Sequence, residues 1–277
     1  MAKKFIIVDS AQIEARILAW LAGQDDLVQG FANNEDVYSV FATDLFGVHV
    51  RKPRKDDPKM LYDHHQIKRG FGKDAILGAG FGMGANKFYS RCLENESLRP
   101  LFDSGAYDFD FINALIRLYR SKYTMIPEFW IDVEKAFMWV VKYPHEKVYS
   151  TDHLFFSNDN GTVMIRLPSG RCLRYRHASL DNKKQLRYHW GPLWGGSITE
   201  NIVQAVARDL LGYWILECEK AGLHIVLHVH DETVGLVEEE VAKESLATMS
   251  SIVCSGPAWS KGLPLGVEGC IGDYYGK

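Results

Sequence analysis

The chain has 277 residues, of which 47% are hydrophobic and 24% charged, and its formal net charge is −3. This balance is typical of a globular protein with a substantial core and excludes a chain dominated by disorder. Its apolar runs are too short for a membrane helix or a signal peptide, so we expect a cytoplasmic protein with no membrane contact. The five cysteines are scattered, which favours reduced thiols over a disulfide framework or a cysteine-bound zinc.

The predicted elements begin with a short apolar run at residues 5–8, which is typical of a buried strand. Asp9 follows this strand, and a helix is predicted from about residue 12 to residue 22. Later elements, in chain order, are helices within 26–47, a loop at 51–59, helices within 64–93 and 108–142, a β-hairpin within 163–175, an amphipathic helix over 199–220 that ends at Gly222, and strands at 223–230 and 233–237 with Asp231-Glu232 as their turn.

Basic residues gather locally although the whole chain is slightly acidic. Residues 51–59, 68–73 and 171–184 are the basic segments. Such segments attract the phosphates of nucleic acids, whereas an ordinary solvated charged surface has the same composition. The sequence leaves both interpretations open for each segment.

The first segment that indicates chemistry is Asp9 at the end of the predicted strand, with Glu14 on the helix that follows. A carboxylate at a strand end suits a divalent metal, because the sheet fixes its oxygens while one side stays open to substrate. A helix cap explains Asp9 about as well.

The second segment is His230-Asp231-Glu232 at the tip of the predicted hairpin. A solvated polar turn is the simplest interpretation of two acids at such a place. Alternatively, His224, His228 and His230 share one strand face with the spacing of zinc ligands, although no fourth ligand is evident.

The third segment contains Arg69, Lys73, Leu77 and Phe81, each four residues after the last. On one helix these residues form a stripe that is basic at its N-terminal end and therefore suits a polyphosphate. The glycines of residues 78–84 do not have the spacing of a dinucleotide-binding loop.

Together and in this order, the three segments resemble motifs A, B and C of the family A DNA polymerases, in the form found in phage enzymes. The match covers nearly the whole chain. The residues that carry it are Asp9 to Arg16, Asp36-Val37-Tyr38, Arg69 to Gly82, Trp194 to Ala205, Val229 to Glu232, and Lys261 to Leu265.

The resemblance implies a mixed α/β fold, in which a mostly helical fingers lobe is inserted into a polymerase palm sheet and the thumb and exonuclease domains are absent. The implied bounds are palm at 1–30, fingers at 31–175 and palm again at 176–277. The implied function is template-directed DNA synthesis by two-metal nucleotidyl transfer from a dNTP to the primer 3′-hydroxyl.

The resemblance also implies a role for each matched residue. Asp9 and Asp231 would hold two Mg²⁺ ions, and Lys73 would protonate the leaving pyrophosphate. Glu14 would exclude a ribose 2′-hydroxyl. The further residues assigned to the nucleotide are Arg69, Gln12, Leu77, Phe81 and Tyr38, and those assigned to DNA are His230, Gln204 and Glu232.

Several positions depart from the family pattern. Ser10 and Ala11 replace a Tyr-Ser pair, and Phe81 replaces a common Tyr. Tyr38 stands where many members have a phosphate-binding His, which predicts one weaker triphosphate contact. Leu77 stands where members often carry Phe or Tyr beside the sugar, which predicts discrimination against dideoxynucleotides.

Family A polymerases carry a thumb and the first palm strands before motif A, whereas Asp9 lies close to Met1. We therefore expect primer-template DNA, dNTPs and a second polypeptide with the thumb and remaining palm as partners. The alternatives are a truncated chain, an inactive remnant, a non-catalytic DNA-binding replisome subunit, and a metal-dependent hydrolase that uses the three histidines.

Overall fold

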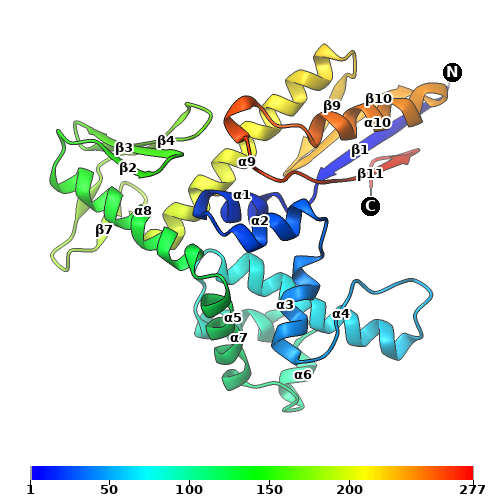
Figure 1. Ribbon diagram of the computed structural model, residues 1–277, viewed down its shortest axis with the longest axis horizontal. Coiled ribbons are helices and arrows are strands. Elements are labelled where there is room, and N and C mark those ends of the chain that lie inside the picture. The colour runs from blue at the N-terminus through cyan, green and yellow to red at the C-terminus, as the bar shows by residue number, and fades with distance from the viewer. Residues whose placement is uncertain (1, 277) are drawn as a thin grey trace.

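The computed structural model describes residues 2–276, which form a mixed arrangement of helices and antiparallel strands (Figure 1). The helices are α1 (Ile13–Ala22), α2 (Asp25–Ala32), α3 (Val37–Phe46), α4 (Lys59–Asp74), α5 (Ala85–Glu94), α6 (Arg99–Asp103), α7 (Phe109–Lys122), α8 (Met125–Lys142), α9 (Gly195–Lys220) and α10 (Ala242–Val253). A π-helical segment, η1 (Ala75–Ala79), continues α4, and short 3₁₀ turns are η2 (Glu239–Val241) and η3 (Ala258–Ser260).

The strands form three sheets. Their bounds are β1 (Lys3–Ser10), β2 (Val148–Thr151), β3 (Leu154–Asp159), β4 (Thr162–Arg166), β5 (Cys172–Tyr175), β6 (Ser179–Leu180), β7 (Leu186–Tyr188), β8 (Gly191–Pro192), β9 (Ile225–Val229), β10 (Glu232–Glu238) and β11 (Val267–Gly272). The sheets have the orders β11-β1-β10-β9, β2-β3-β4-β5 and β6-β7-β8.

The four-stranded sheet brings the beginning and the end of the chain together. β1 lies between β10 and β11 and is antiparallel to both. Ile6 and Val8 of β1 are fully buried, as expected for β-branched side chains in a central strand. Helix α10 packs against β1. The sheet is therefore a rigid support for the residues at the end of β1.

The helices between residues 25 and 142 extend away from this sheet, and the two smaller sheets lie at the opposite end of the molecule from it (Figure 1). Packed rings hold the lower helical region together, with Tyr107 and Phe111 at 4.6 Å between ring centroids and Phe71 against both at 5.1 and 5.3 Å. Helix α9 runs from the small sheets toward the four-stranded sheet (Figure 1), and thereby connects the two ends.

The structure confirms the mixed α/β prediction and most of the predicted elements. Several boundaries differ from the prediction, and two of these differences concern the elements around the cleft. Helix α9 begins at Gly195 rather than near Thr199, because Ser197 Oγ accepts from the Trp194 N–H and donates to the Trp194 carbonyl. The hairpin turn is His230-Asp231, and Glu232 is already the first residue of β10.

The domain bounds 1–30, 31–175 and 176–277 stay a prediction. Among the residues that the structure describes, no helix is both long and apolar enough to cross a bilayer.

Candidate active site

A cleft of about 990 Å³ opens where the four-stranded sheet meets α1, α4 and α9. Most of the residues predicted for the site line it, although they are distant in the sequence. They are Asp9, Gln12, Glu14, Tyr38, Arg69, Lys73, Leu77, Gln204, His230 and Asp231. Phe81 and Glu232 are not part of its lining.

Asp9 lies on β1, and Asp231 lies in the turn that leads into the neighbouring strand β10. Asp9 is opposite Glu232 in the β1–β10 register, and the Ser10 N–H donates to the Asp231 carbonyl at 3.2 Å. Both acids line the same cleft. The helix-cap alternative for Asp9 was wrong, because the residue at the N-cap of α1 is Gln12.

The turn that carries Asp231 has an uncommon backbone. His230 has a φ of 53°, in the left-handed region that non-glycine residues seldom adopt. This conformation closes a two-residue turn between Val229 and Glu232, which pair directly. Glu232 is 5% exposed and starts the next strand, so its backbone supports the turn and its side chain is not part of an open polar tip.

The three-histidine zinc site was a wrong alternative. His230 lies in the turn, where strand alternation has ended, and His224 lies before β9. His224 Nδ1 is instead 3.2 Å from Glu219 Oε2. Across residues 2–276, no group of three or more His, Cys, Asp or Glu side chains is arranged to hold a metal ion.

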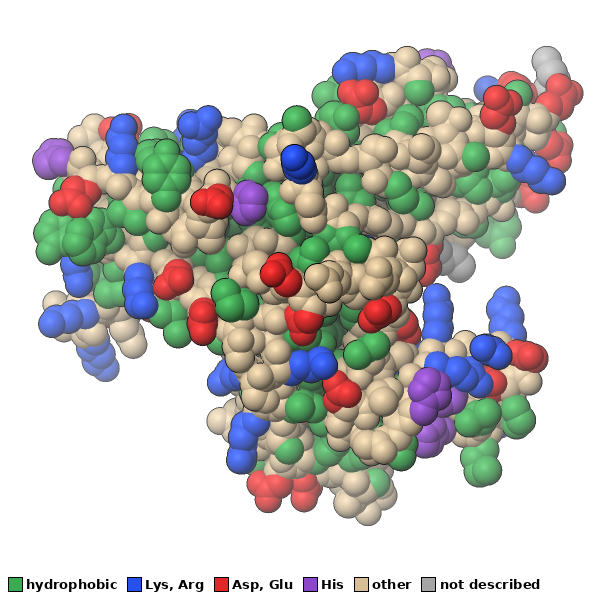
Figure 2. All heavy atoms as spheres, viewed as in Figure 1, with side chains coloured by type: hydrophobic (Ala, Val, Ile, Leu, Met, Phe, Trp, Pro, Cys, Tyr) green, Lys and Arg blue, Asp and Glu red, His purple; other side chains and the backbone are tan. Residues whose placement is uncertain are grey.

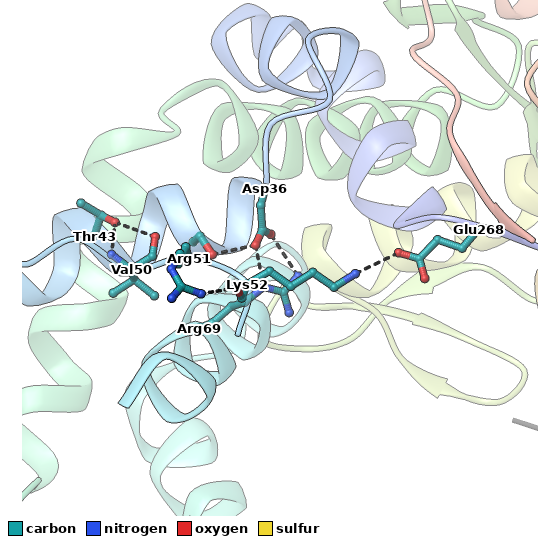
Figure 3. Close-up of polar contacts among 8 residues, drawn as sticks. Asp36, Thr43, Val50, Arg51, Lys52, Arg69 and Glu268 are labelled. Carbon is teal, nitrogen blue, oxygen red and sulfur yellow. Dashed lines mark hydrogen bonds and ion pairs between the residues drawn. The ribbon is translucent and has the colours of Figure 1, made fainter. Parts of the chain in front are cut away.

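Arg69 is held in the cleft by a carboxylate to which the sequence interpretation gave no role. Its Nε donates to Asp36 Oδ2 at 2.6 Å, and its Nη2 donates to Oδ1 at 3.0 Å (Figure 3). The guanidinium carbon is 5.3 Å from the centre of the Tyr38 ring. Burial works to raise the pKa of Asp36, but hydrogen bonds from Arg69 and Ser39 outweigh it and hold this pKa below its usual value.

Burial also perturbs the groups on the other side of the cleft. It raises the pKa of Glu14, which accepts a hydrogen bond from Gln204 and is repelled by Glu200 and Asp231. Burial raises the pKa of Tyr38 to about 12. Both side chains therefore favour their neutral, protonated forms more strongly than the same groups do in water.

The predicted stripe after Arg69 is only partly helical. Arg69 and Lys73 lie on α4, whereas Leu77 lies in the π-helical segment. The chain then turns at residues 80–82, where Gly82 has a φ of 78°. Phe81 is therefore off the helix, and its predicted place on one continuous stripe was wrong. Isolated π-helical turns occur frequently at functional sites.

Two further residues of the cleft mouth were missed. Lys52 Nζ is 3.4 Å from Glu268 Oε1, and in Figure 3 the lysine extends from the segment beside α4 toward the carboxylate. Glu268 is opposite Asp9 in the β1–β11 register. The basic composition of residues 51–59 pointed to the lysine, but no pattern in the sequence pointed to Glu268.

No family model matches the chain. It is 32% identical over 295 residues to the DNA polymerase of Bacillus phage SP02, a match that covers 99% of this chain and 41% of the relative. It is 23% identical over 273 residues to the thermostable DNA polymerase I of Thermus thermophilus, covering 97% of this chain and 26% of that relative. The chain thus spans less than half the length of these relatives.

Among solved structures, the chain is similar to the POL domain of Pol1 from M. smegmatis, in complex with DNA primer-template and dNTP. The TM-score is 0.61 at 19% identity, and the match covers 98% of this chain and 39% of that one. This likeness shows the polymerase-domain fold. These relatives and this fold support the resemblance to the family A DNA polymerases of the phage type that the three ordered motifs indicate.

Proposed function

We propose that the chain supplies the palm and fingers for template-directed DNA synthesis. The observation that carries this proposal is that Asp9 and Asp231 line one cleft together with Arg69 and Lys73. Carboxylates and cations in one cleft are what nucleotidyl transfer needs, because it uses oxygen ligands for divalent cations and positive partners for a triphosphate.

The donors at the end of β1 fit a divalent metal. Carboxylate oxygens are ligands that Mg²⁺ prefers, and Asp9 presents them from β1 while Asp231 presents them from the turn hydrogen-bonded to the end of that strand. We propose that these two residues hold two Mg²⁺ ions. When bound, the ions would lower the pKa of the primer 3′-hydroxyl and neutralise charge on the triphosphate.

The cations of α4 would act on the triphosphate. Arg69 keeps a fixed direction through its two hydrogen bonds to Asp36, so its remaining N–H groups can bind phosphate oxygens. Lys73, one turn further along the helix, would give a proton to the leaving pyrophosphate. Tyr38 and Gln12 would complete the triphosphate end of the site.

The opposite wall would bind the sugar and the DNA. Glu14, fixed by Gln204, would exclude a ribose 2′-hydroxyl, and Leu77 would lie beside the sugar. His230 and Gln204 would contact the primer terminus, while Glu232 would act by supporting the His230-Asp231 turn. Phe81 would meet the nascent base pair only if the turn at residues 80–82 moves on substrate binding.

The second polypeptide stays a prediction. Val226 and Leu227 of edge strand β9 are 53% and 40% exposed, which supports a further contact on that side of the palm. Addition of a thumb-bearing polypeptide should raise primer extension by this chain. Co-purification of both from the native source would support an obligate complex, and equal extension with and without addition would contradict it.

The central experiment is primer extension with a labelled primer-template, dNTPs and Mg²⁺. Asp9→Ala with Asp231→Ala should abolish extension. The matched control, Asp103→Ala with Asp132→Ala, removes two exposed acids outside the cleft lining and should extend as the unmodified chain does. Undiminished DNA binding without synthesis, with or without a thumb-bearing polypeptide, would instead support a non-catalytic DNA-binding subunit.

A further inference from the structure

A second hollow lies outside the cleft, on the small sheets. Its volume is about 240 Å³, and its lining consists of Arg174, Arg176, His177, Tyr188, His189 and Trp190. We call these six residues the basic–aromatic surface. Every one of them is either a ring or a cation, and the lining contains no acid.

The surrounding sequence is strongly basic in a chain that is acidic overall. Residues 160–199 contain seven Lys and Arg but one acid, Asp181, whereas the whole chain has a net charge of −3. Asp181 is occupied locally, because its Oδ1 accepts the backbone N–H groups of Lys183 and Gln185. Figure 2 shows Lys and Arg side chains gathered at the end of the molecule that carries β7.

The charges of the basic–aromatic surface are not used to hold the fold. Among the ion pairs within residues 2–276, Arg171 is the only arginine of residues 160–199 that takes part, and it pairs with Asp209 of α9. Arg174 and Arg176 are exposed. Exposed cations gathered without acids repel one another, so a structural role alone does not account for them.

Trp190 is presented on the surface by a tight hairpin. It lies in the two-residue turn between β7 and β8, where Tyr188 pairs with Gly191, and its side chain is 80% exposed. The His189 ring packs against it at 4.8 Å between centroids. The His189 N–H also donates to the Arg176 carbonyl at 2.9 Å, which fixes the turn beside the arginine.

We propose that the basic–aromatic surface binds single-stranded DNA. Exposed rings offer faces on which unpaired bases stack, and the arginines offer partners for the phosphates between those bases. A duplex hides its base faces, and an acidic peptide has charge but no bases to stack. The combination of exposed rings and unpaired arginines therefore favours a single strand.

The fold also connects this surface to the cleft. Arg171, shortly before β5, donates to Asp209 and to the Ala205 carbonyl of α9. The same stretch of α9 presents Gln204 and Arg208 to the cleft. If the proposed function holds, on which this step rests, the single strand is the unpaired template on its way to the cleft.

Binding is tested on the full chain by anisotropy of a labelled oligothymidylate of about 20 nucleotides. The variant Arg174→Ala, Arg176→Ala, Trp190→Ala should bind about tenfold more weakly, and its salt dependence should fall by about 1.4 in slope because two phosphate contacts are lost. Trp190→Phe, which keeps a stacking face, should retain most of the affinity.

The matched control, Lys87→Ala, Arg99→Ala, Tyr274→Ala, also removes two cations and one ring, all exposed, and should bind as the unmodified chain does. Equal affinity of the two triple variants would overturn the proposal. The proposal would also be overturned if only the arginine substitutions, and not Trp190→Ala, weakened DNA binding and if oligoglutamate competed fully with the oligothymidylate. That result would assign the surface to an acidic peptide.

DNA binding and DNA synthesis are measured separately, so that failure of this proposal can be distinguished from failure of the proposed function. The surface variant should lose the same affinity for single-stranded DNA whether or not Asp9→Ala and Asp231→Ala are also present. If the unmodified chain proves inactive in synthesis but the surface variant still loses this affinity, only the proposed function is refuted. In an active chain, the surface variant should slow extension on templates with long unpaired overhangs and not on those with short ones. Equal slowing on both would refute the template assignment.

Discussion

Arg69 and Asp36 form a bidentate ion pair that ties α4 to the start of α3, with the guanidinium in the wall of the cleft. Two of the five guanidinium N–H groups are committed to Asp36, which leaves the others for a ligand. The carboxylate thus fixes the direction of a cation that would otherwise sample many rotamers.

Asp36→Ala removes this fixation and leaves Arg69 in place. We expect the KM for dNTP in steady-state primer extension to rise about tenfold, with a smaller change in kcat, because a charge-assisted hydrogen bond contributes roughly 1.5–3 kcal/mol. Ser39→Ala is the control, since it removes only the hydroxyl that donates to Asp36 Oδ2 at 2.6 Å. Equal effects of the two substitutions would show that Arg69 needs no fixed direction.

The pairing of Arg69 with Asp36 is a contact that local sequence patterns do not predict. Periodicity predicted β1, the 163–175 hairpin and most of α9, because each depends on local alternation or helical spacing. It did not predict that α3 lies against α4, because that packing joins segments without any shared local pattern. The sequence therefore predicts Asp36 as part of a motif but not as the partner of Arg69.

Local patterns also misplaced residues where the backbone departs from regular geometry. Spacing by four residues predicted one helical stripe through Phe81, but the π-helical segment Ala75–Ala79 and the turn after it end that stripe at Leu77. The histidine spacing predicted a shared strand face, whereas the left-handed backbone of His230 takes it out of the strand. No local pattern predicts that Asp9 and Asp231 lie in one cleft; only the family resemblance predicts it.

Tyr38 makes the stability of the protein depend on pH in the alkaline range. Burial raises its pKa from 10 to about 12, so the folded state holds a proton that the unfolded state loses. Its contribution is fully present below pH 10 and is lost as the pH rises toward 12. Because other buried tyrosines behave alike, the comparison with Tyr38→Phe isolates this contribution.

The free energy of unfolding, measured with urea at several pH values, should fall less steeply for Tyr38→Phe than for the unmodified chain. The difference in slope between pH 10 and 12 should approach about 1.4 kcal/mol per pH unit, which corresponds to one proton. Parallel curves would mean that the Tyr38 hydroxyl is not buried in solution.

Two glycines of α9 should respond in opposite directions to the same substitution. A Cβ on Gly196 would lie 2.2 Å from the Trp194 ring and 2.4 Å from the Phe81 carbonyl, whereas a Cβ on Gly212 would meet nothing within 4 Å. Gly196→Ala should therefore lower the free energy of unfolding by about 1–3 kcal/mol through overpacking. Gly212→Ala should raise it by up to about 1 kcal/mol, because alanine favours a helix.

Urea unfolding of both variants tests this contrast, and a stabilising Gly196→Ala would contradict it. The result bears on the cleft, because Trp194 also covers Gly82 and Trp130 Nε1 donates to the Gly80 carbonyl at 2.9 Å. The turn after the π-helical segment thus contacts α8 and the start of α9. Gly196→Ala should for this reason also impair primer extension.

Leu77 gives a prediction about substrate choice, which rests on the proposed function. Its side chain lines the cleft within the π-helical segment, at the position that the family resemblance puts beside the sugar. An apolar side chain offers no hydrogen bond to compensate for a missing 3′-hydroxyl. The unmodified chain should therefore prefer dNTPs strongly over dideoxynucleotides, as measured by kcat/KM in single-nucleotide extension.

Leu77→Tyr should reduce that preference by about tenfold or more. A polar partner beside the sugar changes the discrimination between substrates with and without a hydroxyl group far more than a change in apolar volume does. Leu77→Phe is the matched control, since it introduces the same ring without the hydroxyl. If Phe and Tyr shift the preference equally, ring size decides it. If neither does, Leu77 does not face the sugar, and the correspondence of the π-helical segment with motif B ends before this residue.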